Sequence, residues 1–96
     1  MNRDETLEII RKHKSELAEK YGVTSIGVFG SVARDEATDE SDVDVVVEMT
    51  MPDLFSMVHI KELLENATNK RVDVVRFRDD MNPRLRRRII REAHYV

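Results

Sequence analysis

Two aspartates, Asp42 and Asp44, interrupt a run of valines and are the first candidates for chemistry. The segment Ser41–Val47 reads Ser-Asp-Val-Asp-Val-Val-Val, and consecutive valines favour a β-strand. Side chains alternate along a strand, so both carboxylates are expected on one face and the valines between them on the other. Two adjacent carboxylates suit a hard cation such as Mg²⁺. The alternative without a function is an exposed strand end that carries two acids and binds no metal.

A Gly-Ser turn precedes this pair. Val28-Phe29-Gly30-Ser31 reads as a strand that runs into a tight turn and a short helix. Backbone N–H groups at a helix start, together with the Ser31 hydroxyl, can hold phosphate oxygens, and Arg34 would add a charged contact. Gly-Ser also occurs in ordinary turns, and Arg34 is equally consistent with a solvated arginine. Because the turn lies beside a carboxylate pair, we favour Mg²⁺-dependent nucleotide chemistry.

A third acid stands inside another apolar segment. Asp73 lies within Arg71-Val72-Asp73-Val74-Val75, again among valines. If this strand pairs with the one that carries Asp42 and Asp44, the three carboxylates come together. Such a group can hold two Mg²⁺ ions, which neutralise a triphosphate and flank an in-line displacement. This interpretation depends on the strand pairing, and Asp73 is otherwise a structural residue.

Alternating helices and strands must position these groups. Helical spacing of apolar residues predicts a first helix, and valine-rich segments predict three strands between further helices. The predicted order αβαβαβα indicates an α/β (α+β) domain with helices around a small mixed sheet. The expected elements are a helix over about Asp4–Lys20, a strand over Thr24–Phe29, a turn and short helix over Ser31–Ala37, a strand over Ser41–Met49, a helix from an N-cap at Thr50 to about Ala67, a strand over Arg71–Phe77, and a last helix opened by Asn82-Pro83.

Composition narrows the class of protein. With 96 residues the chain is expected to form one domain, residues 1–96. A formal net charge of −3 argues against general nucleic-acid binding, which usually shows as a basic excess. Cysteine is absent, which excludes disulfides and thiolate metal sites. The charged N-terminus and the lack of a long apolar run predict a cytoplasmic protein with no membrane segment.

Taken together, these motifs resemble the minimal nucleotidyltransferases of the DNA polymerase β-like superfamily. The shared signature is a Gly-Ser turn, a short helix, Asp-x-Asp on the next strand and an aspartate on a later strand. In this chain it consists of Gly30, Ser31, Arg34, Asp42, Asp44 and Asp73. The resemblance covers nearly the whole chain, including the closing segment Arg91-Glu92-Ala93-His94-Tyr95. The combined motif is specific, whereas Gly-Ser or Asp-x-Asp alone is weak. One departure is visible, because the family usually has glycine where this chain has Asp35.

The resemblance implies a function. Minimal nucleotidyltransferases act as antitoxins encoded beside HEPN-domain toxins and transfer AMP from ATP to a toxin tyrosine. By this resemblance, Asp42, Asp44 and Asp73 would be the catalytic and metal-binding residues for two Mg²⁺ ions. Gly30, Ser31 and Arg34 would bind the nucleotide. Nothing in the sequence itself selects adenine.

Two questions stay open at the level of sequence. The first alternative is not an enzyme but a binding module, which would neutralise a partner by docking without catalysis. The second is nucleotidyl transfer to RNA, which the negative net charge disfavours. The last predicted helix carries five arginines, with Arg84, Arg88 and Arg91 on one face. These arginines indicate RNA contact, docking to an acidic partner, or a solvated surface.

Overall fold

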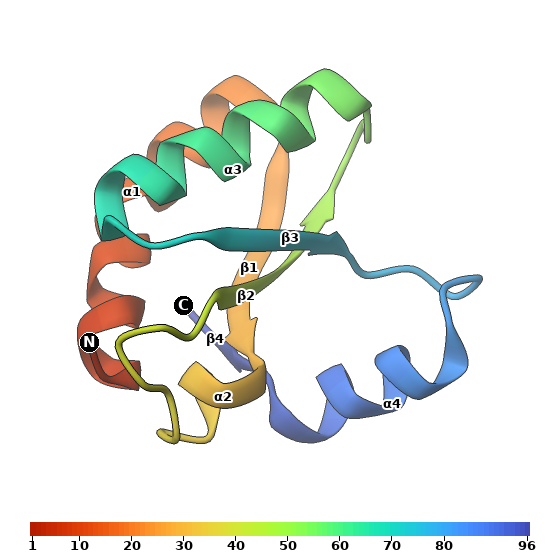
Figure 1. The fold of residues 1–96 in the computed structure, drawn as a ribbon. Coiled ribbons are helices and arrows are strands. Elements are labelled where there is room, and N and C mark those ends of the chain that lie inside the picture. The colour runs from red at the N-terminus through yellow and green to blue at the C-terminus, as the bar shows by residue number, and fades with distance from the viewer.

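The computed structural model describes residues 1–96. Four helices and four strands alternate along the chain (Figure 1). The predicted order is confirmed through the last helix, and a short strand follows it. The helices are α1 (Arg3–Tyr21), α2 (Gly30–Ala33), α3 (Leu54–Thr68) and α4 (Pro83–Glu92); the strands are β1 (Val23–Phe29), β2 (Val43–Met49), β3 (Val72–Arg76) and β4 (His94–Tyr95).

The strands form one mixed sheet in the order β3-β2-β1-β4. β1 runs antiparallel to both β2 and β4, whereas β2 and β3 are parallel, with α3 as the crossover between them. This arrangement places β2 in the interior of the sheet, which explains its nearly continuous run of valines. It also confirms the pairing on which the role of Asp73 depends.

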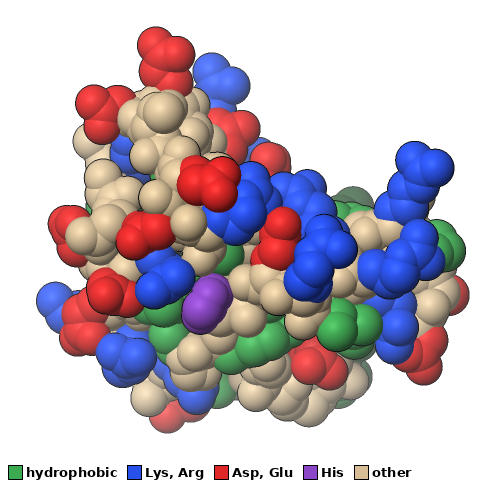
Figure 2. Space-filling model, turned by 90° about the horizontal axis from the view of Figure 1, so that it is seen from below, with side chains coloured by type: hydrophobic (Ala, Val, Ile, Leu, Met, Phe, Trp, Pro, Cys, Tyr) green, Lys and Arg blue, Asp and Glu red, His purple; other side chains and the backbone are tan.

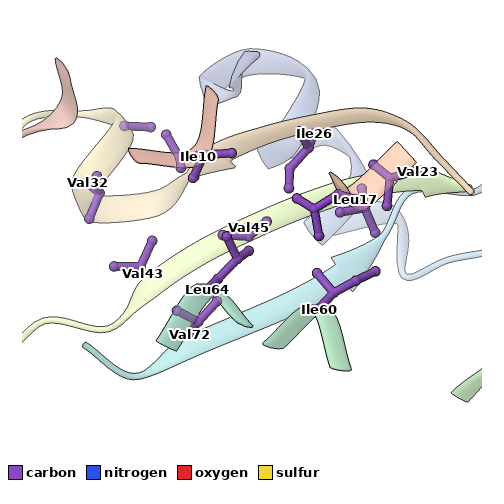
Figure 3. Close-up of a cluster of buried hydrophobic side chains, with 13 residues drawn as sticks. Ile10, Leu17, Val23, Ile26, Val32, Val43, Val45, Ile60, Leu64 and Val72 are labelled. Carbon is purple, nitrogen blue, oxygen red and sulfur yellow. The ribbon is translucent and has the colours of Figure 1, made fainter. Parts of the chain in front are cut away.

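Alternate residues of β2 face two different clusters of buried side chains. Val43, Val45 and Val47 belong to the main core, to which α1 and α3 contribute (Figure 3). Val46 belongs to a smaller cluster on the opposite face, together with Ile89 of α4. Because Asp44 lies between Val43 and Val45, the alternation places it on the opposite face from these valines, as the sequence predicted, and this is the face that α4 covers.

Local signals fix the ends of the helices. At α1, the Asn2 side chain and Glu5 form a reciprocal capping box, and Gly22 ends the helix in the left-handed conformation. The predicted start of α3 is wrong. Thr50 is not its N-cap, because the Thr50 N–H donates to the Gly22 carbonyl and prolongs the β1–β2 pairing. Asp53 caps α3 instead, accepting the Ser56 N–H at 2.8 Å.

The C-terminal residues were not predicted as a strand. His94 and Tyr95 pair with Val28 and Gly27, and the Val96 N–H donates to the Ile26 carbonyl at 3.1 Å. A Cβ atom at Gly27 would lie 2.5 Å from the His94 carbonyl oxygen, so glycine lets this strand approach. The pairing returns the chain to the sheet directly after α4 and so fixes that helix against it. No helix combines the length and the apolar character needed to cross a membrane.

Candidate active site

The three candidate aspartates come together at one edge of the α4 face. Asp44 of β2 lies directly opposite Asp73 of β3 in the parallel register. Asp42 immediately precedes β2, and its charge acts on the Asp44 carboxyl, so the two residues lie near each other. Asp44 is half-buried, whereas Asp42 and Asp73 are exposed. The fold therefore places Asp73 opposite Asp44 and Asp42 two residues before it, although the three carboxylates do not converge on one point.

The electrostatics of Asp44 show how closely these charges interact. Burial raises the pKa of its carboxyl above the ordinary value, and the negative charge of Asp73 raises it further. The guanidinium of Arg88 opposes this rise, and the charge of Asp42 adds to it. Ionised Asp44 is therefore incompletely neutralised by the protein itself. A bound cation would relieve this repulsion.

The turn after β1 is built against Asp44. Phe29, the last residue of β1, pairs with Asp44, and Gly30 follows with φ +73°. A Cβ atom at position 30 would lie 2.2 Å from Asp44 Oδ2 and 3.2 Å from an Nη atom of Arg88. Glycine is thus required twice, for its left-handed backbone and for the space that the carboxylate occupies.

This geometry predicts a severe effect of Gly30→Ala. The left-handed backbone alone costs an alanine about 1–2 kcal/mol, and overlap with the Asp44 carboxylate adds to it and displaces a candidate ligand. Gly22→Ala is the matched control, since Gly22 has φ +69° but its Cβ would meet only the Thr50 side chain closely. Denaturant unfolding should show destabilisation of both variants. Nucleotide transfer should be lost only in Gly30→Ala, and equal transfer by the two would contradict this account of the turn.

The other two predicted nucleotide-binding residues lie on or beside α2. Ser31 is half-buried in this one-turn helix, directly after Gly30. Arg34 follows the helix, and its Nη1 donates to Glu92 Oε1 at 2.8 Å, while its Nε contacts Glu36 at 3.4 Å. Arg34 is therefore held in place near the turn, unlike the freely solvated arginine that the sequence equally allowed.

Asp35, which stands where the related family usually has glycine, is oriented by the N-terminal helix. Its φ of +60° explains the preference for glycine at this position, and aspartate is among the residues that best tolerate this conformation. The Asp35 carboxylate accepts the Arg3 N–H at 3.0 Å. This contact ties the carboxylate to the start of α1.

Two residues of α4 belong to this region and were not identified from the sequence as parts of the site. Arg88 lies next to Gly30 and Asp44, with its guanidinium 5.7 Å from the centre of the Phe29 ring. Glu92, one turn later, accepts hydrogen bonds from Arg34, Arg88 and the Gly30 N–H. Their spacing of four residues was the available signal, but only the packing of α4 shows which arginine of the run lies at the Gly30 turn.

The face around α2 and α4 is open and strongly charged. Figure 2 shows this face from below, with Lys and Arg side chains gathered over the half on which α4 lies. Arg84, Arg87 and Arg91 of α4 are exposed. Next to Asp42, a depression is lined entirely by polar and charged residues of segments 39–42 and 69–71. Such an open site does not enclose two substrates by itself.

The carboxylates suit Mg²⁺ as a pair rather than as a closed protein site. No three His, Asp or Glu side chains converge closely enough to hold an ion by themselves. Mg²⁺ usually binds through one or two carboxylates and completes its shell with water and substrate phosphates. The uncompensated charge around Asp44 and the adjacent Asp42 fit that mode of binding.

Comparison with known proteins identifies the class. Residues 10–96 match the family model described as a nucleotidyltransferase domain. The chain belongs to this family. It is 38% identical over 94 residues to the protein adenylyltransferase MntA of Thermococcus cleftensis, covering 97% of this chain and 94% of that protein. The prediction of an enzyme of the nucleotidyltransferase class is confirmed.

Solved structures agree on the fold of this nucleotidyltransferase. One minimal nucleotidyltransferase superposes with a TM-score of 0.78 at 38% identity, covering 98% of this chain and 95% of that one. A Shewanella oneidensis complex of a tri-AMPylated HEPN toxin with an MNT antitoxin gives a TM-score of 0.71 at 18% identity, covering 97% and 70%. The second likeness concerns the fold alone. The predicted nucleotidyltransferase fold is confirmed.

Proposed function

We propose that this chain is a Mg²⁺-dependent protein adenylyltransferase that transfers AMP from ATP to a tyrosine hydroxyl of a HEPN-type toxin and thereby acts as its antitoxin. The observation that carries the proposal is the register of Asp44 against Asp73 beside the Gly30 turn. Residues 1–96 would act as one minimal nucleotidyltransferase domain. The reaction belongs in the cytoplasm, where ATP is available.

On the donor side, the residues around α2 hold the triphosphate. The Ser31 hydroxyl makes no hydrogen bond within the chain and is free to donate to a phosphate oxygen, while Arg34 supplies positive charge. Gly30 contributes by letting the backbone approach closely, since its own N–H is already bonded to Glu92. Adenine as the base is supported by the named activity of the related MntA protein.

The three aspartates would bind the metal ions and accept the proton of the acceptor hydroxyl. Asp42 and Asp44 would hold two Mg²⁺ ions together with the phosphates, with Asp73 as a further ligand of one of them. When bound, the ions supply charge neutralisation to the triphosphate and to the developing charge of the transition state. Asp73 is exposed and opposite Asp44, so it can also accept the proton of an incoming hydroxyl.

The transfer itself is a single displacement at phosphorus. The acceptor oxygen forms a bond to the α-phosphorus of ATP, and the bond from that phosphorus to the oxygen bridging to the β-phosphate breaks. Pyrophosphate leaves with the bonding electron pair, and the hydroxyl proton passes to Asp73. Positioning and electrostatics would supply most of the acceleration.

A protein partner is supported by the openness of the site. A domain of this size leaves the carboxylates at a surface edge, so the acceptor must arrive on another molecule that closes the site. In the structurally similar Shewanella oneidensis complex, the protein bound to the MNT antitoxin is an AMPylated HEPN toxin. The exposed arginines of α4 give an acidic partner a complementary surface beside the site.

The test is transfer of label from α-³²P-labelled ATP in the presence of Mg²⁺ and a HEPN protein encoded beside this chain. The expected product is the HEPN protein carrying covalent AMP, absent when its acceptor tyrosine is replaced by phenylalanine. A chain that neutralises the toxin without any label transfer would instead be a docking antitoxin. Label that requires Mg²⁺ but persists in the phenylalanine variant would contradict tyrosine as the acceptor.

A further inference from the structure

Glu92, near the end of α4, joins the helix to both parts of the candidate nucleotide site. We propose that Glu92 is a positioning residue, which holds Arg34 and the Gly30 turn in the arrangement that the triphosphate requires. The inference rests on the proposed nucleotide transfer and adds to it a residue outside the family signature described above. Glu92 is separated from Gly30 by 62 positions, so this link exists only in the folded protein.

The two carboxylate oxygens of Glu92 hold different groups. Oε1 accepts from Arg34 Nη1 at 2.8 Å, and Oε2 accepts from the Gly30 N–H and from Arg88 Nε, both at 3.3 Å. The Glu92 side chain is only 11% exposed. A nearly buried carboxylate that holds two donors from residues 30–34 and one from its own helix is an organising centre rather than a surface ion pair.

The charge of Glu92 is maintained by its surroundings. Burial alone would raise the pKa of its carboxyl, but the hydrogen bond and charge of Arg34 lower it, and the pKa lies below its ordinary value. The Gly30 N–H and the charge of Arg88 act in the same direction. Glu92 therefore stays ionised between two guanidinium groups, of which Arg34 also contacts Glu36 and Arg88 also lies beside Asp44.

A competing explanation is that Glu92 merely occupies the place of a phosphate and must be displaced. The geometry of Arg34 favours positioning, because its Nη2 makes no hydrogen bond within the chain. A phosphate can therefore bind Nη2 while Glu92 still holds Nη1. The hydrogen bond from the Gly30 N–H to Glu92 also supports positioning. It fixes the backbone of the glycine against which the Asp44 carboxylate packs.

The two explanations predict opposite results for Glu92→Gln. Positioning predicts that the loss of the ionised acceptor loosens Arg34, so that kcat/KM for Mg²⁺–ATP falls about 10–100-fold, the usual range for a displaced supporting residue. Simple competition predicts tighter nucleotide binding, because a negative charge has been removed. The matched control is Glu36→Gln, which removes the same charge near the same Arg34 but leaves Gly30 untouched. It should change kcat/KM by less than about 2–3-fold, as surface pairs contribute little.

A second variant separates charge from position. Glu92→Asp keeps the charge but is shorter by one methylene group, so it cannot hold Arg34 and Gly30 together, and transfer should again fall. Amide hydrogen exchange at Gly30 in the nucleotide-free protein should accelerate in both Glu92 variants and not in Glu36→Gln. Thermal melting of each variant establishes that it is folded.

The outcomes distinguish this inference from the proposed function. A parent protein that transfers AMP, together with a Glu92→Asp variant of parental kcat/KM, overturns the positioning role and leaves the function standing. Stronger Mg²⁺–ATP binding by Glu92→Gln overturns it in favour of competition. A parent protein that neither binds nor transfers nucleotide overturns the proposed function and the inference with it, even if exchange at Gly30 responds as expected.

Discussion

Replacing Asp42 and Asp44 together by asparagine is expected to abolish nucleotide transfer and leave the protein folded. Amide oxygens are neutral and cannot supply the charge that Mg²⁺–ATP needs from this site. Isothermal titration calorimetry should show the loss of Mg²⁺–ATP affinity, and a transfer assay should show no labelled product. Affinity equal to that of the parent protein would rule out the assigned metal role.

The same double variant should be more stable than the parent at neutral pH. Asp44 has a raised pKa when folded, so its ionised form is less favourable in the native state than in the unfolded chain. The destabilisation is therefore present above the raised pKa and disappears as the pH falls through it. The stability gain of the variant, measured by urea unfolding, should be largest near pH 7 and shrink toward acidic pH. A gain that is constant with pH would have another cause.

Glu48→Gln is the control for both measurements. Glu48 lies on the same strand and carries the same charge, but it is exposed near the far end of β2, where it pairs with Ser25. Its replacement should leave Mg²⁺–ATP affinity unchanged and stability within about 0.5 kcal/mol, as for most surface substitutions. A loss of affinity in this variant would indicate a general effect of net charge.

Asp73→Asn is the second variant with a large expected effect, and it acts on chemistry more than on binding. The side chain keeps its shape and loses its ability to accept a proton, so transfer should fall about 10²–10⁴-fold, the range for a lost general base. Mg²⁺–ATP should still bind through the groups around β2 and α2. Single-turnover kinetics at saturating ATP separate the two steps, because only the transfer rate should change.

The result for Asp73 also separates an enzyme from a docking protein. Asp80→Asn, which replaces an exposed acid in the loop after β3, is the matched control and should transfer at the parental rate. Parental transfer by Asp73→Asn would make Asp73 a structural residue despite its register with Asp44. If parent and variant neutralise the partner equally and neither transfers AMP, the chain acts by docking.

Local patterns were sufficient for most of the fold. The valine-rich strands, the helix ended by Gly22 and the helix opened by Asn82-Pro83 were predicted because caps, breakers and side-chain alternation act over a few residues. The start of α3 was predicted wrongly because a contact between distant residues decides it. The Thr50 N–H is taken by a carbonyl 28 residues away, and no local pattern indicates that bond.

The sequence by itself determined the chemical types in the site. Aspartates on a valine strand, a Gly-Ser turn and a third acid on another strand are local facts, and their combination is enough to indicate nucleotidyl transfer. It also predicted that Asp42 and Asp44 share one side of the chain, because side chains alternate along a strand, but Asp42 lies just before β2. Whether Asp73 joined them depended on strand order.

Only the tertiary structure decided how these parts meet. The parallel pairing of β2 and β3 placed Asp73 opposite Asp44. The packing of α4 placed Arg88, one of its five arginines, and Glu92 beside the Gly30 turn. In the sequence these α4 residues are part of a charged run on a helix. Contacts between residues far apart in the chain depend on how whole elements pack, and the local preferences of a segment carry no information about its distant partner.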